Sequence, residues 1–181
     1  MNIIVMKFGG TSVADTEKLK NIVNIVSQEV KKYKVVVVLS AMAGETNKLQ
    51  GYLDQFGSQN SIESDLVLTS GEQVTIGLLS AALKNEGIKS IPLLGWQIPI
   101  ITDDNHEKAK ILQIDSKRIN RYFENKDVIV LAGFQGINLD GNITSLGRGG
   151  SDTTAVAIAS SIDAERCDIY TDVDGVYTAD P

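Results

Sequence analysis

The residues best suited to chemistry lie in one glycine-rich stretch, Ser145–Thr154, which reads SLGRGGSDTT. It follows an aliphatic run (128–131) and precedes an Ala/Val/Ile-rich segment (155–162), a pattern that predicts a loop leading into a helix that starts near Asp152. The first amides of a helix are unpaired and partly positive, and glycines let a ligand approach the backbone closely. Arg148 adds a planar guanidinium that fits a carboxylate or a phosphate. The stretch therefore predicts an anion-binding site, and the alternative is a surface loop before a well-capped helix.

A second candidate for anion binding is Lys7-Phe8-Gly9-Gly10, which ends the apolar run at the start of the chain. Ligands of open parallel α/β sheets bind at the carboxyl ends of the strands, where Lys7 would lie. The lysine precedes the glycines, so this is not a Walker loop, and a G-x-G-x-x-G dinucleotide fingerprint is absent. The alternative is a lysine that extends from a strand end before a tight turn.

Three polar residues of interest lie outside these stretches, and two of them, Glu72 and Thr46, have two interpretations each. Glu72 lies in an otherwise apolar helix, where it could face a ligand or simply be solvated. Thr46 follows a predicted strand end, and its hydroxyl could contact a ligand or cap a helix. His106, the single histidine, lies in a polar run and is predicted to be exposed and without a role.

Composition narrows the class of protein. The 181 residues, with 43% hydrophobic content, are enough for one domain spanning 1–181 with a substantial core. The net charge of -6 argues against nucleic acid as a partner, because phosphate backbones require clustered Lys and Arg. No uninterrupted apolar run approaches the roughly 20 residues of a membrane span, and the N-terminus does not resemble a signal peptide. The single cysteine, Cys167, excludes an internal disulfide and a cysteine-rich zinc site, so we expect a cytoplasmic protein without membrane contact.

Hydrophobic periodicity predicts alternating strands and helices. The unit strand–helix–strand over 2–39 is the crossover unit of a parallel sheet. The predicted strands are Asn2–Phe8, Val35–Leu39, Lys89–Leu94, Asp127–Leu131 and Cys167–Thr171, and the predicted helices are Thr16–Tyr33, Thr46–Phe56, Asp65–Leu83, Ile114–Glu124 and Thr153–Ile162. Asp140-Gly141 predicts a β-hairpin within Gly133–Thr144, and 95–104 is left without assignment. The fold class is α/β, a three-layer α/β/α sandwich with a mainly parallel central sheet.

Four candidate stretches lie at the carboxyl ends of predicted strands, so we expect them to meet at one edge of the sheet: Lys7–Gly10, Ser40–Thr46, Gly133–Ser151 and Thr171–Asp174. Their shared chemistry is anion binding, and the sequence shows neither a base–nucleophile pair nor a cluster of metal ligands. Such a site would work by positioning and charge neutralisation, which is typical of phosphoryl transfer. A carboxylate acceptor would need no general base, because a carboxyl group with a pKa near 4 is already ionised at neutral pH.

Four motifs resemble those of the aspartate kinases, which belong to the amino acid kinase family. They are Lys7–Val13 (KFGGTSV), Gly71-Glu72, Ser145–Thr154 and Tyr170–Tyr177 (YTDVDGVY). The resemblance implies a carbamate kinase-like fold and ATP-dependent, Mg²⁺-assisted phosphorylation of the β-carboxylate of L-aspartate to 4-phospho-L-aspartate. This reaction is the first step of lysine, threonine, methionine and diaminopimelate biosynthesis, and the full-length proteins are expected to be homo-oligomers.

The resemblance also implies a role for each matching residue. Lys7, held by Asp152, would neutralise charge on the transferring phosphoryl group. The substrate-binding residues would be Thr46, Glu72, Arg148, Gly149, Gly150 and Ser151, with Glu72 taking the ammonium group. The nucleotide would be bound by Lys7, Phe8, Gly9, Gly10, Thr171, Asp172, Tyr177 and Asp180, and no residue is assigned to a metal.

Members of the family continue beyond the position of Pro181 with further nucleotide-binding residues and regulatory ACT domains. The resemblance therefore implies the N-terminal part of a catalytic domain, incomplete on its nucleotide side and without ACT domains. We expect this chain alone to bind ATP weakly and to have little or no kinase activity. The alternative function is a non-catalytic module of the same fold that binds a ligand or dimerises.

Overall fold

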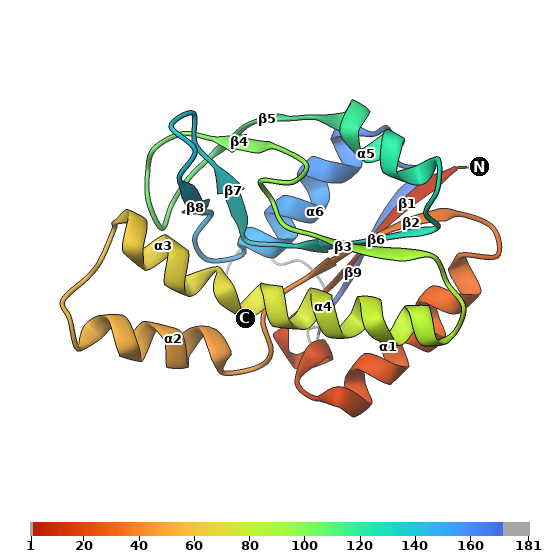
Figure 1. The fold of residues 1–181 in the computed structure, drawn as a ribbon, viewed down its shortest axis with the longest axis horizontal. Coiled ribbons are helices and arrows are strands. Elements are labelled where there is room, and N and C mark those ends of the chain that lie inside the picture. The colour runs from red at the N-terminus through yellow and green to blue at the C-terminus, as the bar shows by residue number, and fades with distance from the viewer. Residues whose placement is uncertain (1, 172–181) are drawn as a thin grey trace.

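A five-stranded parallel sheet, in the order β3-β6-β2-β1-β9, forms the centre of the molecule (Figure 1). The computed structural model describes residues 2–171. The strands are β1 (Ile3–Phe8), β2 (Lys34–Leu39), β3 (Ser90–Leu93), β6 (Val128–Ala132) and β9 (Arg166–Tyr170). The β-branched runs of β2 and β6 are buried almost throughout, as expected for central parallel strands.

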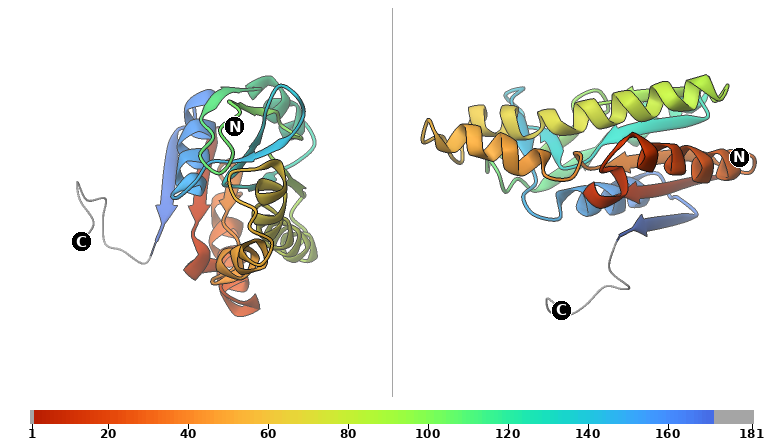
Figure 2. Two further views of the ribbon diagram at one scale, coloured as in Figure 1. Left: turned by 90° about the vertical axis from the view of Figure 1, so that its left-hand side faces the viewer. Right: turned by 90° about the horizontal axis from the view of Figure 1, so that it is seen from below.

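Helices cover both faces of this sheet, which confirms the predicted three-layer α/β/α sandwich (Figures 1 and 2). On one face lie α1 (Thr16–Glu29) and α4 (Ser70–Asn85), and on the other lie α5 (Ser116–Phe123) and α6 (Gly150–Ser161). Within residues 2–171 the strand β9 lies at the edge of the sheet and pairs with β1.

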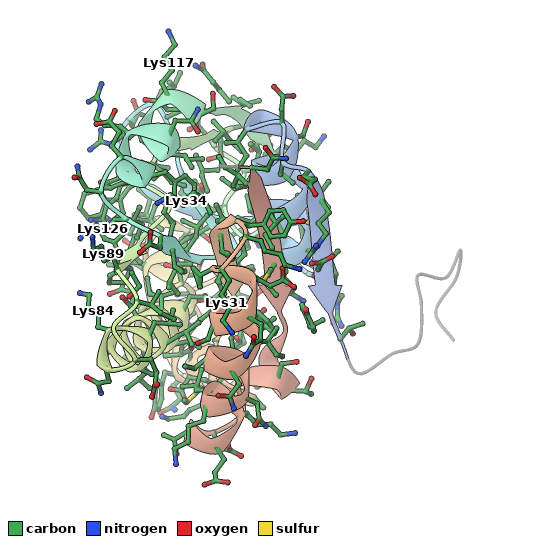
Figure 3. All side chains as sticks on the ribbon, turned by 90° about the vertical axis from the view of Figure 1, so that its right-hand side faces the viewer. Lys31, Lys34, Lys84, Lys89, Lys117 and Lys126 are labelled. Atoms are coloured by element: carbon green, nitrogen blue, oxygen red, sulfur yellow. The ribbon has the colours of Figure 1, made fainter. Side chains whose placement is uncertain are left out.

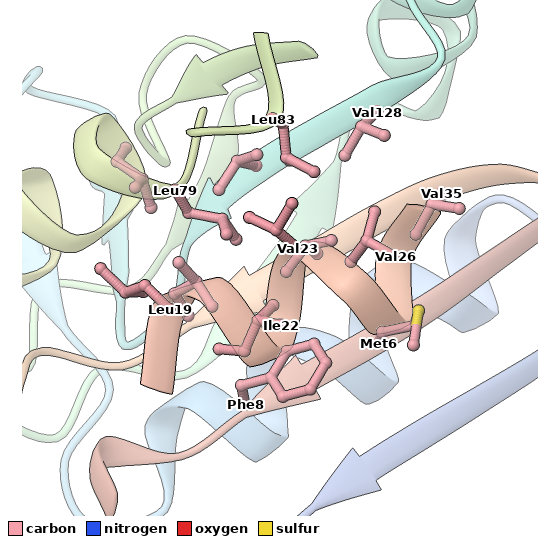
Figure 4. Packing of buried hydrophobic residues seen from close by; sticks show 14 of the residues in the cluster. Met6, Phe8, Leu19, Ile22, Val23, Val26, Val35, Leu79, Leu83 and Val128 are labelled. Carbon is pink, nitrogen blue, oxygen red and sulfur yellow. The ribbon is translucent and has the colours of Figure 1, made fainter. Parts of the chain in front are cut away.

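Alternation along β1 divides its side chains between two cores. Met6 and Phe8 pack with α1 and α4 in the cluster drawn in Figure 4, whereas Val5 belongs to the core beneath α6. Since successive side chains of a strand point to opposite faces, Lys7 lies on the same face as Val5 and is directed toward α6. This alternation places the Lys7 ammonium group on the α6 side of the sheet.

A second, smaller sheet lies beside the first and was not predicted as a sheet. Its order is β5-β4-β7-β8, with β4 (Ile100–Thr102), β5 (Ile111–Ile114), β7 (Gln135–Ile137) and β8 (Ile143–Ser145). The pair β7–β8 is the predicted hairpin, and Gly141 has the left-handed φ of 86° that its turn requires. The unassigned segment 95–104 contributes β4.

The predicted boundaries of one helix were wrong. The predicted helix Asp65–Leu83 is two helices, α3 (Ile62–Leu68) and α4, and α3 starts earlier because Ser61 and Ser64 form a capping box. The remaining helices are α2 (Glu45–Asp54) and a 3-10 turn, η1 (Gly10–Val13).

The combined run Ile62–Asn85 is long and apolar enough to cross a membrane by length and composition, but half of its most apolar window is buried inside this domain, as in a core helix.

Candidate active site

The register of the central strands brings the candidate residues to one edge of the sheet. Phe8 pairs with Leu39, and Leu39 pairs with Ala132, so the residues that follow these strands emerge side by side. There they surround a pocket with a volume of about 280 Å³. Its lining residues are Lys7, Gly9, Gly10, Ser40, Thr46, Glu72, Phe134, Gly147, Arg148, Gly149, Gly150, Ser151 and Asp152.

The amino end of α6 forms one wall of the pocket. The helix starts at Gly150, two residues before the predicted position, because Gly149 adopts a left-handed conformation (φ 74°) as its N-cap. No side chain caps this helix. The amides of Gly150 and Asp152 donate to the carbonyls of Gly147 and Gly149, at 3.0 Å each, whereas the Ser151 amide has no hydrogen-bond partner within residues 2–171 and is available for an anionic ligand. A Cβ on Gly150 would lie 2.8 Å from the Phe134 ring, so the close packing here requires glycine.

Lys7 and Asp152 face each other across the pocket floor. The Lys7 Nζ lies 2.6 Å from Asp152 Oδ1, and the lysine side chain is only 9% exposed while that of Asp152 is 46% exposed. The aspartate therefore both holds the ammonium in place and compensates its charge. This geometry agrees with the predicted pairing of these two residues.

Glu72 is buried, so the interpretation of a solvated helix face was wrong. One carboxylate oxygen, Oε1, accepts a hydrogen bond from the Ala41 amide at 3.1 Å. The other, Oε2, is buried and has no hydrogen-bond partner among residues 2–171. Burial raises the pKa of Glu72 from 4.5 to about 7, against the lowering effect of its backbone hydrogen bonds. An unpaired buried carboxylate oxygen lining a pocket is suited to receive a cationic group.

Ser151 is fixed by close packing under the first turn of α6. Its Oγ lies 3.0 Å from the Ser40 hydroxyl, which follows β2. A Cβ on Gly133 would lie 2.7 Å from this same Oγ, so the glycine after β6 is needed for the helix to approach the sheet. The two hydroxyls and the neighbouring amides supply neutral donors on the floor of the pocket.

Arg148 lies at the exposed rim, between the main pocket and a neighbouring hollow. Within residues 2–171 the structure gives its guanidinium no ion pair or hydrogen bond, so the fork is free to bind an anion. Thr46, in the first turn of α2, lines both hollows with it. These two residues form the outer boundary of the site.

The pocket contains most, but not all, of the predicted site residues. The Phe8 side chain packs in the core and stacks on Tyr170, with ring centroids 4.4 Å apart, so only its backbone could face a nucleotide. Thr171 follows β9, and Asp172, Tyr177 and Asp180 lie outside the described residues. Ser40, Phe134 and Gly147 also line the pocket; they lie in stretches expected at this edge of the sheet, but no binding role was predicted for any of them. All three follow a strand end, which was the available signal.

Electrostatics distinguish this edge of the sheet from the opposite one. Figure 3 labels six lysines, among which Lys34, Lys89 and Lys126 begin or precede strands and therefore lie at the amino ends of the sheet. Among residues 2–171, the basic side chains that line the pocket are Lys7 and Arg148, and the amino end of α6 adds partial positive charge. Among residues 2–171 there is no group of three or more potential metal ligands.

The prediction for His106 was wrong. Its Nδ1 lies 2.6 Å from the Asp65 carboxylate, and its side chain is only 16% exposed. Asp65 is fully buried on α3 and also receives hydrogen bonds from Ser145 and from the Glu107 amide. The polar run around His106 is therefore attached to the protein beside the glycine-rich loop rather than being freely solvated.

Comparison with known proteins gives the same class as the fold and the pocket. The family model for the amino acid kinase family matches residues 2–181. The chain is 49% identical to an aspartokinase of Rickettsia conorii and 49% identical to one of Geobacillus stearothermophilus, in each case over its whole length. It superposes on Escherichia coli aspartokinase III in complex with aspartate and ADP with a TM-score of 0.82 and 27% identity, covering 99% of this chain and 51% of that one. For aspartate kinase from Synechocystis the TM-score is 0.80 at 39% identity, covering 98% of this chain and 30% of that one.

A family model that covers nearly the whole chain, together with an α/β/α sandwich of matching topology, establishes the class: this chain belongs to the amino acid kinase family. Its similar relatives are aspartokinases, which confirms the resemblance read from the four motifs. The chain spans about half the length of these relatives, 46% of the Rickettsia conorii protein and 45% of the Geobacillus stearothermophilus protein.

Proposed function

We propose that the protein to which this chain belongs is an aspartate kinase, and that the pocket binds L-aspartate for phosphorylation of its β-carboxylate by ATP. The observation that carries the proposal is the unpaired Oε2 of Glu72, buried in the same pocket as the Arg148 guanidinium and the α6 amides. One buried acceptor facing several anion donors matches an amino acid with an ammonium group and two carboxylates. The similar relatives are named aspartokinases, and the Escherichia coli structure contains aspartate and ADP.

Each pocket residue then has a role that follows from its place. Glu72 receives the ammonium group, and Arg148, Ser151 and the backbone of the Gly149-Gly150 turn bind the carboxylates. Thr46 adds a hydroxyl at the rim. The reacting β-carboxylate needs no proton removed, so the site requires orientation and charge neutralisation only.

Lys7 neutralises charge on the transferring phosphoryl group, and Asp152 holds the ammonium in position at 2.6 Å. Gly9 and Gly10 leave room for phosphates beside it, since both line the pocket without side chains. On the nucleotide side, β9 ends at Tyr170, and the Thr171, Asp172, Tyr177 and Asp180 assignments remain proposals.

Mg²⁺ fits this site only as a partner of the nucleotide. Phosphoryl-transfer sites use one or two carboxylates with the phosphate oxygens as magnesium ligands, and they do not need an all-protein cage. The described residues offer no such cage, and Asp152 is the half-exposed carboxylate in the pocket. The bound ion would supply further neutralisation of phosphate charge. We place the reaction in the cytoplasm, in lysine, threonine, methionine and diaminopimelate biosynthesis, and in a homo-oligomer without nucleic-acid or membrane partners.

Calorimetry and product trapping on the 181-residue chain test this proposal. We expect L-aspartate to bind, Mg-ATP to bind weakly, and hydroxylamine to trap little aspartyl phosphate. Normal rates of aspartyl phosphate formation would overturn the expectation of weak activity. Absence of any aspartate binding in folded protein would favour the alternative, a non-catalytic module of the same fold.

A further inference from the structure

The cluster centred on Asp65 lies next to the pocket but is not part of it. Asp65, on α3, is fully buried, and its carboxylate accepts three hydrogen bonds. Oδ1 accepts from the Ser145 hydroxyl at 2.5 Å and from the Glu107 amide at 3.0 Å, and Oδ2 pairs with His106 Nδ1 at 2.6 Å. A charged group out of contact with water needs such partners, and removing one leaves an uncompensated acceptor.

The three partners of Asp65 belong to the two segments that flank Arg148 in space. Ser145 ends β8, three residues before Arg148, and its carbonyl accepts the Ala109 amide at 2.9 Å. Glu107 belongs to the segment against which Gly147 packs, because a Cβ on Gly147 would lie 2.9 Å from the Glu107 carbonyl oxygen. Asp65 therefore links α3, the 106–107 segment and the end of β8 at one point.

Arg148 itself has no side-chain partner among residues 2–171, so the position of its guanidinium depends on the backbone beneath it. That backbone is unusual, because Gly147 and Gly149 on either side both have left-handed φ values (77° and 74°). A loop between two glycines has few conformational restraints of its own. Two backbone hydrogen bonds hold it, from Gly150 to the Gly147 carbonyl at 3.0 Å and from Leu146 to the Phe134 carbonyl at 2.9 Å, and the Asp65 cluster adds a side-chain restraint at Ser145.

We propose that Asp65 is a positioning residue for the substrate site: through Ser145 and the His106–Glu107 segment it holds the glycine loop so that Arg148 faces the pocket. The inference rests on the proposed function for the identity of the ligand, but not for the restraint on the loop. The Asp65 carboxylate does not line the pocket and does not touch the substrate. It acts on affinity by pre-organising the guanidinium and the α6 amides.

The test compares Ser145→Ala with a matched control, Ser90→Ala. Both serines are fully or almost fully buried and hydrogen-bonded to a buried partner, since Ser90 Oγ contacts the Ser80 hydroxyl at 2.9 Å at the start of β3. Each variant removes one buried serine hydroxyl, which donates to the Asp65 carboxylate at Ser145 and bonds the Ser80 hydroxyl and carbonyl at Ser90, and only Ser145 lies at the loop. A merely structural role would make the two variants behave alike.

Two readouts are needed. In ligand-free protein, we expect the NMR amide signals of Gly147, Gly149 and Gly150 to broaden or double in Ser145→Ala and to stay as in wild type in Ser90→Ala. In titrations with L-aspartate, we expect Ser145→Ala to weaken binding on the order of tenfold, because a small displacement of a positioning group costs about this much or more, and Ser90→Ala to bind as wild type does.

His106→Gln gives a second variant if Ser145→Ala does not fold, because His106 is partly exposed and its replacement removes only one partner of Asp65. It should change the same glycine amides and weaken aspartate binding in the same direction. Unchanged loop amides in both folded variants would overturn the positioning role, as would aspartate affinity equal to that of Ser90→Ala. Failure of the wild-type chain to bind aspartate would instead reject the proposed function, and the loop amides would still decide the role of Asp65.

Discussion

The Lys7 ammonium and the Asp152 carboxylate form an ion pair at 2.6 Å in which the two partners are unequally buried, with 9% and 46% of their side chains exposed. The lysine depends on the aspartate more than the reverse, because an unpaired charge costs most where water cannot reach it. The two single substitutions should therefore have different effects on stability.

Asp152→Asn should lower the free energy of unfolding by about 1–2 kcal/mol, less than for a fully buried pair because Asp152 keeps partial access to water. Lys7→Met should cost less than Asp152→Asn, since it leaves a half-exposed carboxylate and an apolar side chain of similar length. Urea unfolding of both variants at pH 7 measures the difference. A larger loss for Lys7→Met would contradict this description of the pair.

Glu72 should make the stability of the ligand-free chain depend on pH. Burial raises its pKa from 4.5 to about 7, so between these values the folded state holds more protons than the unfolded state. The free energy of unfolding must then fall as pH rises through this range, with a total loss on the order of 3 kcal/mol by pH 8. Chemical denaturation from pH 4.5 to 8 should show this contribution as the difference from Glu72→Gln, which lacks the titrating group. Parallel pH curves for the two proteins would show that Glu72 is not desolvated in this way.

The same carboxyl group should control the affinity for an ammonium-bearing ligand. A protonated Glu72 cannot compensate an ammonium charge, so aspartate must displace a proton below pH 7. Affinity should rise as pH increases from 6 to 8, by up to about tenfold per pH unit below the pKa. Succinate, which lacks the ammonium group, should not show this rise. Calorimetry in two buffers of different ionisation enthalpy would count the released proton, and no proton release at pH 6 would contradict the contact.

Gly133 should be intolerant of a methyl group, unlike a glycine elsewhere in the fold. A Cβ there would lie 2.7 Å from Ser151 Oγ and 3.0 Å from its Cα, so Gly133→Ala must displace the first turn of α6. We expect a loss of about 1–3 kcal/mol in stability, together with weaker aspartate binding. The control is Gly77→Ala in α4, where a Cβ would meet nothing within 4 Å. This substitution should stabilise the helix by about 0.5–1 kcal/mol. Equal thermal stability and equal aspartate affinity of the two variants would rule out the packing argument.

The sequence was sufficient to predict the central sheet and the place of the pocket. Runs such as Val35–Leu39 can bury both faces only in the middle of a parallel sheet, and the residues that follow such strands must share one edge. This reasoning placed Lys7, Arg148 and Asp152 together correctly.

What could not be predicted depends on contacts between distant residues. The second sheet pairs strands of three or four residues, which are too short for periodicity to identify. The partner of His106 is Asp65, 41 residues earlier in the chain, and neither residue signals the other locally. The burial of Glu72 likewise depends on a distant residue, Ala41, whose amide donates a hydrogen bond to the Glu72 carboxylate.

The most direct test of the substrate site is a calorimetric titration of wild-type chain and Arg148→Ala with L-aspartate and, separately, with succinate. We expect wild type to bind aspartate more tightly than succinate, because Glu72 takes the ammonium group. Arg148→Ala should weaken aspartate binding by about 10- to 100-fold, because it removes a charge-assisted hydrogen-bond pair. Equal affinities of wild type and Arg148→Ala for aspartate, with both proteins folded, would contradict this substrate site.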